Sequence, residues 1–217
     1  MQYFSGTENV PMDIYAQVRP YKGKNDLVGY ADFHLDNAVW IRDCRIYQKD
    51  PEAEPKIIAP SYTQQARDSD KPVPHYYATF DDPLYKEMQK TVQEALQSKK
   101  HRAQRNMDCG KLFYQPVVKE TQGERTLGRA HMEVTAKKGD LKLFSVNSML
   151  IKQIDDRAYL SMPARKVEKN GTTEYRECIQ LDSPNYFQQN LILHEAQVKG
   201  LLPERADKDK SKEDMER

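Results

Sequence analysis

The sequence contains little that would support a secreted, membrane-spanning or metal-binding protein. Its three cysteines, Cys44, Cys109 and Cys178, are far apart and form no C-x-x-C pair, which favours reduced thiols over a disulfide framework or a zinc site. The first residues lack the basic and then apolar pattern of a signal peptide. No apolar run approaches the roughly 18 residues that a membrane span needs. We therefore predict a soluble, cytoplasmic protein without a cofactor or a bound metal.

Recognisable catalytic motifs are also missing. The five histidines are isolated, and the sequence has no H-E-x-x-H, no G-x-S-x-G and no glycine-rich phosphate loop. Cys44 and Cys178 fall in predicted strands, where small core residues are more common than nucleophiles. We predict that the protein is not an enzyme.

The charge balance is nearly neutral. Hydrophobic residues make up 38% of the 217 residues and charged ones 31%, with a net charge of +1. Residues 12–98 carry 11 basic and 14 acidic side chains, residues 107–197 carry 13 and 12, and residues 99–106 carry four and none. Binding of a polyanion therefore requires local patches. Residues 99–106 and the second half are the expected places for them.

The most informative feature is an internal repeat with a period of about a hundred residues. Phe80-Asp-Asp-Pro83 aligns without gaps on Leu181-Asp-Ser-Pro184, and Tyr85 aligns on Tyr186. Asp82 and Ser183 are helix N-cap types, and the prolines that follow suit the first position of a helix. The chain is thus predicted to be a tandem pair of homologous units.

Alternating apolar and polar residues predict five strands and a helix in each copy. In the first copy the strands are expected at 13–19, 27–35, 39–47, 56–59 and 75–80, and the helix at 83–99. In the second copy they are expected at 111–119, 126–135, 141–152, 158–162 and 174–181, and the helix at 184–201. Each helix carries an apolar stripe, which includes Leu84, Met88 and Val92 in the first and Val198 in the second. This order predicts an α+β fold with antiparallel sheets.

The predicted organisation has five parts. They are a lead-in at 1–11, a first repeat at 12–98, a basic linker at 99–106 that continues the first helix, a second repeat at 107–202, and a charged, disordered tail at 203–217.

The second copy carries residues that resemble a known family. Ser161-Met-Pro-Ala-Arg165-Lys166, a turn at Gly171 and Glu174-Tyr-Arg176-Glu resemble the central motif of stage V sporulation protein G (SpoVG), the septation-regulator family. That motif reads Met-Pro-Ser-Lys-Arg, a glycine turn, then Phe-Arg-Asp. In the first copy, Met12-Asp-Ile resembles the family's start, and Ile41-Arg-Asp43-Cys-Arg45-Ile46 resembles its His-Asp-Ile-Arg-Val strand. The resemblance spans residues 12–98 and 107–198.

The resemblance implies a fold and a function. SpoVG-like domains are a twisted antiparallel sheet with a helix packed on it, they pair into homodimers, and they bind DNA and RNA. Two fused copies would therefore form an internal pseudo-dimer, because fusion raises the effective concentration of the second half. Further homo-oligomerisation stays open.

The two copies have diverged in a complementary way. The first keeps Asp43 and Arg45, but it has Tyr62-Thr63 where the second copy has Arg165 and Lys166. The second copy has Ser148 and Leu150 at the places of Asp43 and Arg45.

The candidate nucleic-acid-binding residues form two basic groups. The first group flanks one hairpin-like loop, where guanidinium and ammonium groups can contact phosphates; it consists of Arg165, Lys166, Lys169 and Arg176. The alternative is a solvated loop, since nearby glutamates dilute the charge. The second group is either a basic arm or a set of cations that favour a helix C-terminus; it consists of Lys99, Lys100 and Arg102.

These observations lead to one main hypothesis and two alternatives. The main hypothesis is a non-enzymatic, DNA- or RNA-binding regulator of the SpoVG type, from a bacterium or a bacterial mobile element. The first alternative is a protein-interaction module that binds a partner through its sheets and its acidic first repeat. The second is an enzyme whose site is assembled between the copies.

Overall fold

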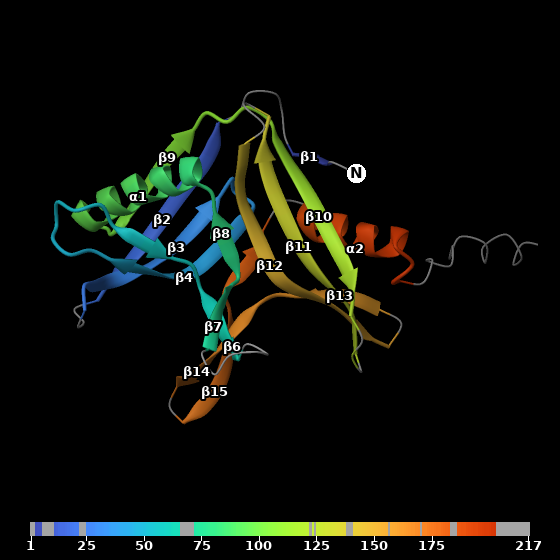
Figure 1. Ribbon diagram of the computed structural model, residues 1–217. Coiled ribbons are helices and arrows are strands. Elements are labelled where there is room, and N and C mark those ends of the chain that lie inside the picture. Colours follow the sequence, from blue (N-terminus) through green and yellow to red (C-terminus); the bar gives the residue numbers. More distant parts are fainter. Residues whose placement is uncertain are drawn as a thin grey trace, which may run out of the picture.

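The computed structural model shows a mixed α+β molecule of mostly antiparallel sheets with two helices (Figure 1). The residues that it describes are 3–5, 11–21, 25–65, 72–121, 123, 125–137, 141–155, 157–169, 171–182 and 186–202. The predicted tail at 203–217 lies outside them. In the described part of the chain, neither helix is long and apolar enough to cross a membrane.

The same order of elements occurs twice along the chain. After a short β1 (Tyr3–Ser5), the first series is β2 (Met12–Pro20), β3 (Leu27–Leu35), β4 (Val39–Tyr47), β5 (Lys56–Ile58), β6 (Ser61–Gln65), β7 (Pro72–Tyr76), β8 (Ala78–Phe80) and α1 (Asp82–Gln97). After β9 (Arg102–Met107), the second series is β10 (Leu112–Glu120), β11 (Thr126–Ala136), β12 (Leu141–Ile154), β13 (Arg157–Ser161), β14 (Ala164–Lys169), β15 (Thr172–Glu177), β16 (Ile179–Leu181) and α2 (Phe187–Val198).

Two strand predictions need correction. The strand predicted at 75–80 is divided at Tyr77 into β7 and β8, and the strand predicted at 174–181 is divided at Cys178 into β15 and β16. Strands β7 and β15 each form a hairpin with a strand that was not predicted, β6 and β14. Both corrections have one cause: the chain leaves a sheet, forms a separate hairpin and then returns to another sheet. Period-two alternation marks each strand but carries no information on that change of partner.

The predicted helical linker is a strand. Helix α1 ends at Gln97, His101 adopts a left-handed conformation with φ 51°, and β9 follows. Strand β9 pairs antiparallel with β2, from Met12 opposite Met107 to Gln17 opposite Arg102. The expectation that residues 99–106 continue the first helix was therefore wrong, because edge pairing with β2 satisfies this backbone instead.

Each series contributes strands to the sheet of the other. Sheet I has the order β16-β4-β3-β2-β9, with β5 on β4; sheet II has the order β1-β10-β11-β12-β13, with β8 on β12. Thus β8 of the first series joins sheet II beside β12, and β9 joins sheet I beside β2 (Figure 1). Strand β16 of the second series joins sheet I beside β4. The two sheets cannot be separated by cutting the chain once without removing strands from both.

Local irregularities also recur at matching positions. Asp43 in β4 has φ 60° and Ser148 in β12 has φ 62°, each beside a register shift in the strand pairing. Gly29 and Gly128 follow a second pair of shifts, and a Cβ at either would lie 2.8 Å from the carbonyl oxygen of Arg19 or 3.0 Å from that of Lys119. A side chain at these glycines would force the paired backbones apart.

The helices cover the inner faces of the sheets. Leu84, Met88 and Val92 of α1 are fully buried, as its apolar stripe predicted. The residue that precedes α1 is Asp81, so Asp82 lies in the first turn and is not the cap. The predicted cap Ser183 and start Pro184 of the second helix lie outside the described residues. Val198, predicted to face the core, is 68% exposed and is the last residue of α2.

A single core joins the two halves. One continuous cluster of buried residues includes Ile14 and Phe33 of sheet I and Tyr114 and Phe144 of sheet II. Tyr114 is fully buried, and its hydroxyl donates a 2.8 Å hydrogen bond to Oδ2 of Asp36, in the turn after β3. Burial raises the pKa of Asp36, and the hydrogen bond from Tyr114 opposes that rise in part.

The Asp36→Asn variant is expected to gain stability relative to the wild type as the pH rises. Because the folded pKa of Asp36 is raised, its stabilising contribution is complete below the unfolded value near 3.9 and is lost as the pH rises through the folded pKa. Asparagine tolerates the left-handed backbone at this position, where φ is 52°. Urea unfolding of both proteins between pH 3 and 7 measures the free energy of unfolding of the variant relative to the wild type. A relative stability of the variant that is constant or falls as the pH rises would contradict the raised pKa of Asp36.

Candidate nucleic-acid interface

The hairpin of β14 and β15 projects from the sheets as a separate two-stranded ribbon (Figure 1). All six residues of β15 are exposed. Arg165 lies opposite Arg176, and Lys166 lies opposite Tyr175. Since neighbouring residues of a strand point to opposite faces, the two arginines share one face and Lys166 shares the other with Tyr175, which is 74% exposed.

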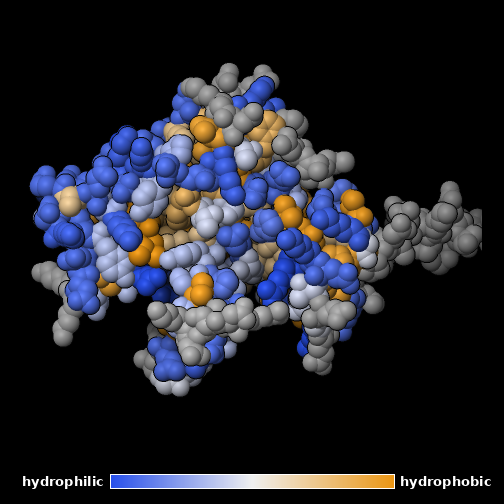
Figure 2. Space-filling model, viewed as in Figure 1, coloured by the Kyte–Doolittle hydropathy of each residue, from blue (hydrophilic) through white to orange (hydrophobic). Residues whose placement is uncertain are grey.

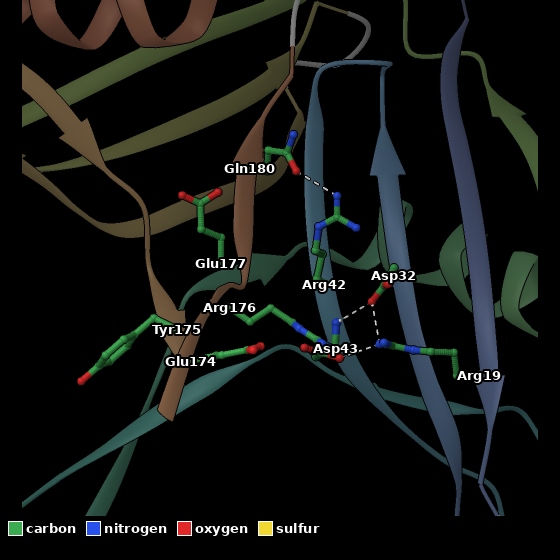
Figure 3. Close-up of a pocket in the computed structure, with 9 residues that line it drawn as sticks. All are labelled: Arg19, Asp32, Arg42, Asp43, Glu174, Tyr175, Arg176, Glu177 and Gln180. Atoms are coloured by element: carbon green, nitrogen blue, oxygen red, sulfur yellow. Dashed lines mark hydrogen bonds and ion pairs between the residues drawn. The ribbon is translucent and has the colours of Figure 1, made fainter. Parts of the chain in front are cut away.

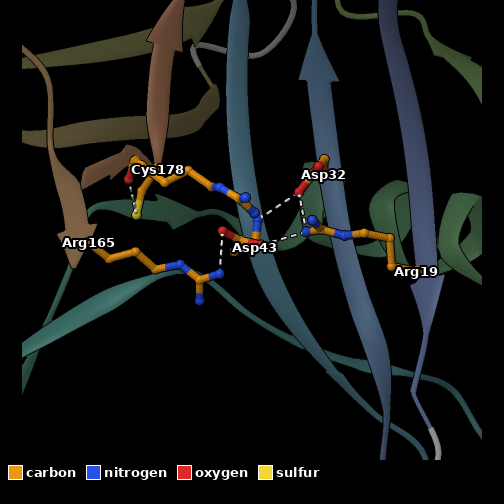
Figure 4. A network of polar contacts seen from close by, with 6 residues as sticks. Arg19, Asp32, Asp43, Arg165 and Cys178 are labelled. Carbon is orange, nitrogen blue, oxygen red and sulfur yellow. Dashed lines mark hydrogen bonds and ion pairs between the residues drawn. The ribbon is translucent and has the colours of Figure 1, made fainter. Parts of the chain in front are cut away.

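Arg165 connects this hairpin to the first half of the molecule. Its Nη2 lies 2.9 Å from Oδ2 of Asp43, whose side chain is only 3% exposed (Figure 4). The contact joins the two residues that the copies keep in complementary fashion, Asp43 from the first and Arg165 from the second. Arg165 was predicted to contact phosphate; here its charge is already opposed by a carboxylate.

Asp43 is part of a wider network. Nη2 of Arg19 lies 2.9 Å from Oδ1 of Asp32 and 2.5 Å from Oδ1 of Asp43, and the backbone N–H of Asp43 donates to Oδ1 of Asp32 at 2.8 Å (Figure 4). The Arg165 contact has the distance of an ion pair but not the geometry of a hydrogen bond, so Oδ2 of Asp43 accepts no hydrogen bond from the described residues. A buried carboxylate oxygen that accepts no hydrogen bond is energetically unfavourable, so the approach of a hydrogen-bond donor to it is favourable.

A cleft of about 440 Å³ opens beside this network, between sheet I and the hairpin (Figure 3). Its lining combines arginines and carboxylates in nearly equal number: Arg19, Asp32, Arg42, Asp43, Glu174, Tyr175, Arg176, Glu177 and Gln180. Glu174 and Arg176 point toward Asp43, and Tyr175 points away (Figure 3). The cleft is therefore polar and charge-balanced, which suits a ligand with both donors and acceptors better than a bare phosphate.

An ordered stack of rings leads to this cleft across the outer face of sheet I. Tyr15, His34 and Trp40 lie side by side on neighbouring strands. The rings of His34 and Trp40 stack at 4.3 Å, and the guanidinium carbon of Arg42 lies 4.7 Å from the centre of the Trp40 ring. Nη2 of Arg42 also donates a 2.8 Å hydrogen bond to Oε1 of Gln180.

The surroundings of His34 favour its neutral form. Burial lowers its pKa, while Asp182 opposes that shift. Sequence reasoning missed this group; the only tryptophan of the chain, at a solvent-facing position of an alternating strand, was the available signal.

The structure separates the predicted basic residues into different regions. Lys166 is exposed and lies 3.3 Å from Glu168, and the side chain of Lys169 lies outside the described part. Lys99, Lys100 and Arg102 are exposed next to β9, at the opposite edge of sheet I from β16 and the hairpin. The two basic groups therefore do not form one continuous patch.

Arg105, in the same basic segment, has a packing role. It pairs with Glu94 and, at 3.1 Å, with Glu87, and so fastens β9 to α1.

The matching place in the other half lacks the carboxylates of Asp32 and Asp43. Ser148 replaces Asp43, Thr79 and Ser145 share a 2.6 Å hydrogen bond, and Tyr62 stacks on His75 and Tyr77 at 5.2 and 5.4 Å. The charged cleft is thus a property of one hairpin and not of the repeated fold.

On the face shown in Figure 2, hydrophobic side chains occur only in small separate groups.

Two other kinds of site find no support in the described residues. No group of histidine, cysteine and acidic side chains there has the arrangement of a metal site. Cys44, Cys109 and Cys178 are buried and free, and burial raises the pKa of each thiol, which disfavours the nucleophilic thiolate.

Comparison with family models, curated proteins and solved structures finds no match for this chain.

Proposed function

We propose that the chain is a tandem SpoVG-like, non-enzymatic regulator that binds DNA or RNA as an internal pseudo-dimer. Three observations support the pseudo-dimer: the repeated order of elements, the matching bulges at Asp43 and Ser148, and the exchange of β8 and β16 between the sheets. In a homodimer such strands would be exchanged between two chains. Here β9 connects the two series within one chain, so both partners of the exchange belong to the same molecule.

The exposed β14–β15 hairpin is the observation that carries the binding proposal. A two-stranded ribbon of this kind fits the major groove of duplex DNA. Its outer face presents Lys166 and Tyr175, and Arg176 forms no ion pair with any described residue. Basic groups on such a ribbon can contact phosphates, and the exposed tyrosine offers a stacking surface for an unpaired base.

Reversal of two hairpin charges tests the proposal. If Lys166 and Arg176 each contact one phosphate, Lys166→Glu/Arg176→Glu should flatten the log–log salt dependence of duplex binding by about 1.8. At 0.1 M salt the affinity should fall by roughly 10- to 100-fold for all sequences alike. Fluorescence anisotropy with labelled DNA and RNA, repeated between about 50 and 200 mM salt, measures both quantities.

The control reverses two positive charges outside the hairpin. Lys56→Glu/Lys86→Glu changes two exposed lysines of β5 and α1 and should leave the salt dependence nearly unchanged. Arg165 is left intact, because its loss would also disturb the buried Asp43. Equal damage from both double variants, or an affinity indifferent to salt, would contradict phosphate contact and favour the protein-partner alternative.

A further inference from the structure

We propose that the cleft between sheet I and the β14–β15 hairpin is a reading site for one unpaired guanine base, supplied by a single-stranded nucleic acid or by a free nucleotide. For nucleic acid, this inference rests on the proposed function and specifies which part of the polymer the site recognises. The volume of about 440 Å³ lies within the range of about 300–1,000 Å³ that small-molecule pockets occupy.

A planar ligand is indicated by the stack that ends at the cleft. His34 on β3 stacks on Trp40 on β4, and the guanidinium carbon of Arg42, two residues further along β4, lies over the Trp40 ring. Arg42 also lines the cleft and its guanidinium is held by Gln180, so a planar ring in the cleft would meet this group. Proteins commonly stack unpaired bases on guanidinium planes as well as on aromatic rings.

Guanine is indicated by the polar groups around that position. Its Watson–Crick edge carries two adjacent donors, N1–H and the N2 amino group, which one carboxylate can accept together. Glu174 points into the cleft and forms no ion pair with any described residue, whereas Oδ2 of Asp43, which accepts no hydrogen bond from the described residues, lies 2.9 Å from Nη2 of Arg165. When an unpaired guanine occupies the cleft, Arg176, on the same face of the hairpin, can donate to O6 and N7 in place of a duplex phosphate, and this is the usual arginine contact of guanine. Adenine and cytosine each present a single amino donor and would leave a carboxylate less well satisfied.

A comparison of matching positions in the two sheets shows that the repeated fold does not itself require the residues of this site. Position 148 has the same left-handed backbone as position 43 but carries a serine. The bulge itself therefore needs no carboxylate. Likewise, Gln115, Glu133 and Ser145 of sheet II occupy the register positions that Tyr15, His34 and Trp40 occupy in sheet I. Neither the stack nor the acidic cleft recurs there.

The test uses the full chain and two probes. The first is a set of twelve-nucleotide thymidine oligomers with one central dG, deoxyinosine, dA or dC; deoxyinosine keeps the guanine ring but lacks the N2 amino group. We expect the dG oligomer to bind about tenfold tighter than the others, the effect of one well-formed bidentate contact. The second probe is guanosine monophosphate, titrated against the fluorescence of Trp40, the only tryptophan.

Two hairpin variants separate recognition from charge. Glu174→Gln should abolish the preference for dG, whereas Glu168→Gln, which removes the same charge from a residue outside the cleft, should retain it. Both positions are exposed, so neither change threatens the fold. Thermal unfolding confirms this for each protein.

The outcomes distinguish the two proposals. Oligomers that bind without base preference and without a change in Trp40 fluorescence would overturn the guanine site and leave the proposed function standing. Guanosine monophosphate that alters Trp40 fluorescence, with no oligomer bound, would support the site for a free nucleotide and overturn the reading of a base in single-stranded nucleic acid. A preference for dG that survives Glu174→Gln would overturn the assignment of the cleft. No response to any probe would overturn the guanine site, while the salt dependence of duplex binding decides the proposed function.

Discussion

Neither half of this protein is expected to form its native fold when produced alone. A cut after Lys99 would deprive sheet I of β9 and β16, and sheet II of β1 and β8. Each fragment would then expose unpaired strand edges and part of the shared core, conditions that promote aggregation or pairing with a second copy. We expect residues 1–99 and 100–217 to show little cooperative unfolding separately. Mixed and refolded together, they should recover a single transition near that of the intact chain.

The measurement combines thermal unfolding by circular dichroism with solution mass. The mixed fragments should sediment as a one-to-one complex, and the intact chain serves as the reference. Two halves that each fold as monomers, as stable as the full chain, would show that strand exchange does not hold the molecule together.

Replacement of Tyr114 by alanine is expected to be the most damaging single change. The ring is fully buried in β10, meets Phe187 of α2 edge-on at 6.3 Å, and donates a hydrogen bond to Asp36 of the first half. Loss of a buried aromatic side chain typically costs about 3–5 kcal/mol, which corresponds to a fall in Tm of roughly 6–20 °C for a protein of this size. Because one core serves both halves, the whole molecule should unfold in one earlier transition.

Two further variants are compared with Tyr114→Ala. One separates the loss of the hydrogen bond from the loss of packing, and the other is a control at a partly exposed tyrosine. Tyr114→Phe keeps the packing but leaves Asp36 without this donor, for a cost of about 1–3 kcal/mol. Tyr159→Ala, at a position 38% exposed in β13, should change the stability by about 0.5 kcal/mol or less. Calorimetric unfolding of the three proteins gives the values. A Tyr114→Ala protein with a melting temperature like that of Tyr159→Ala would refute the role assigned to this ring.

The sequence by itself determined the class of fold and most of its elements. Strands β3 and β4 begin and end at the predicted residues, and the stripe of Leu84, Met88 and Val92 is buried as its spacing required. These features follow from local rules, since alternation with period two or a recurrence every three to four residues records which face of an element meets the core. The two-fold recurrence of the element order was visible for the same reason, as a repeat of local patterns.

Only the tertiary structure decided which strands are neighbours and which charges meet. Alternation shows which side of β8 or β16 is buried, but either sheet could bury it, because sheet partners depend on contacts between residues far apart in the chain. Nor could spacing reveal that Arg165 would lie against Asp43, 122 positions earlier in the numbering, or that His34, Trp40 and Arg42 would lead to the same cleft. The complementary loss of charge in the two copies was visible in the sequence. Its meaning depended on strand exchange, which places the hairpin of the second copy against the bulge of the first.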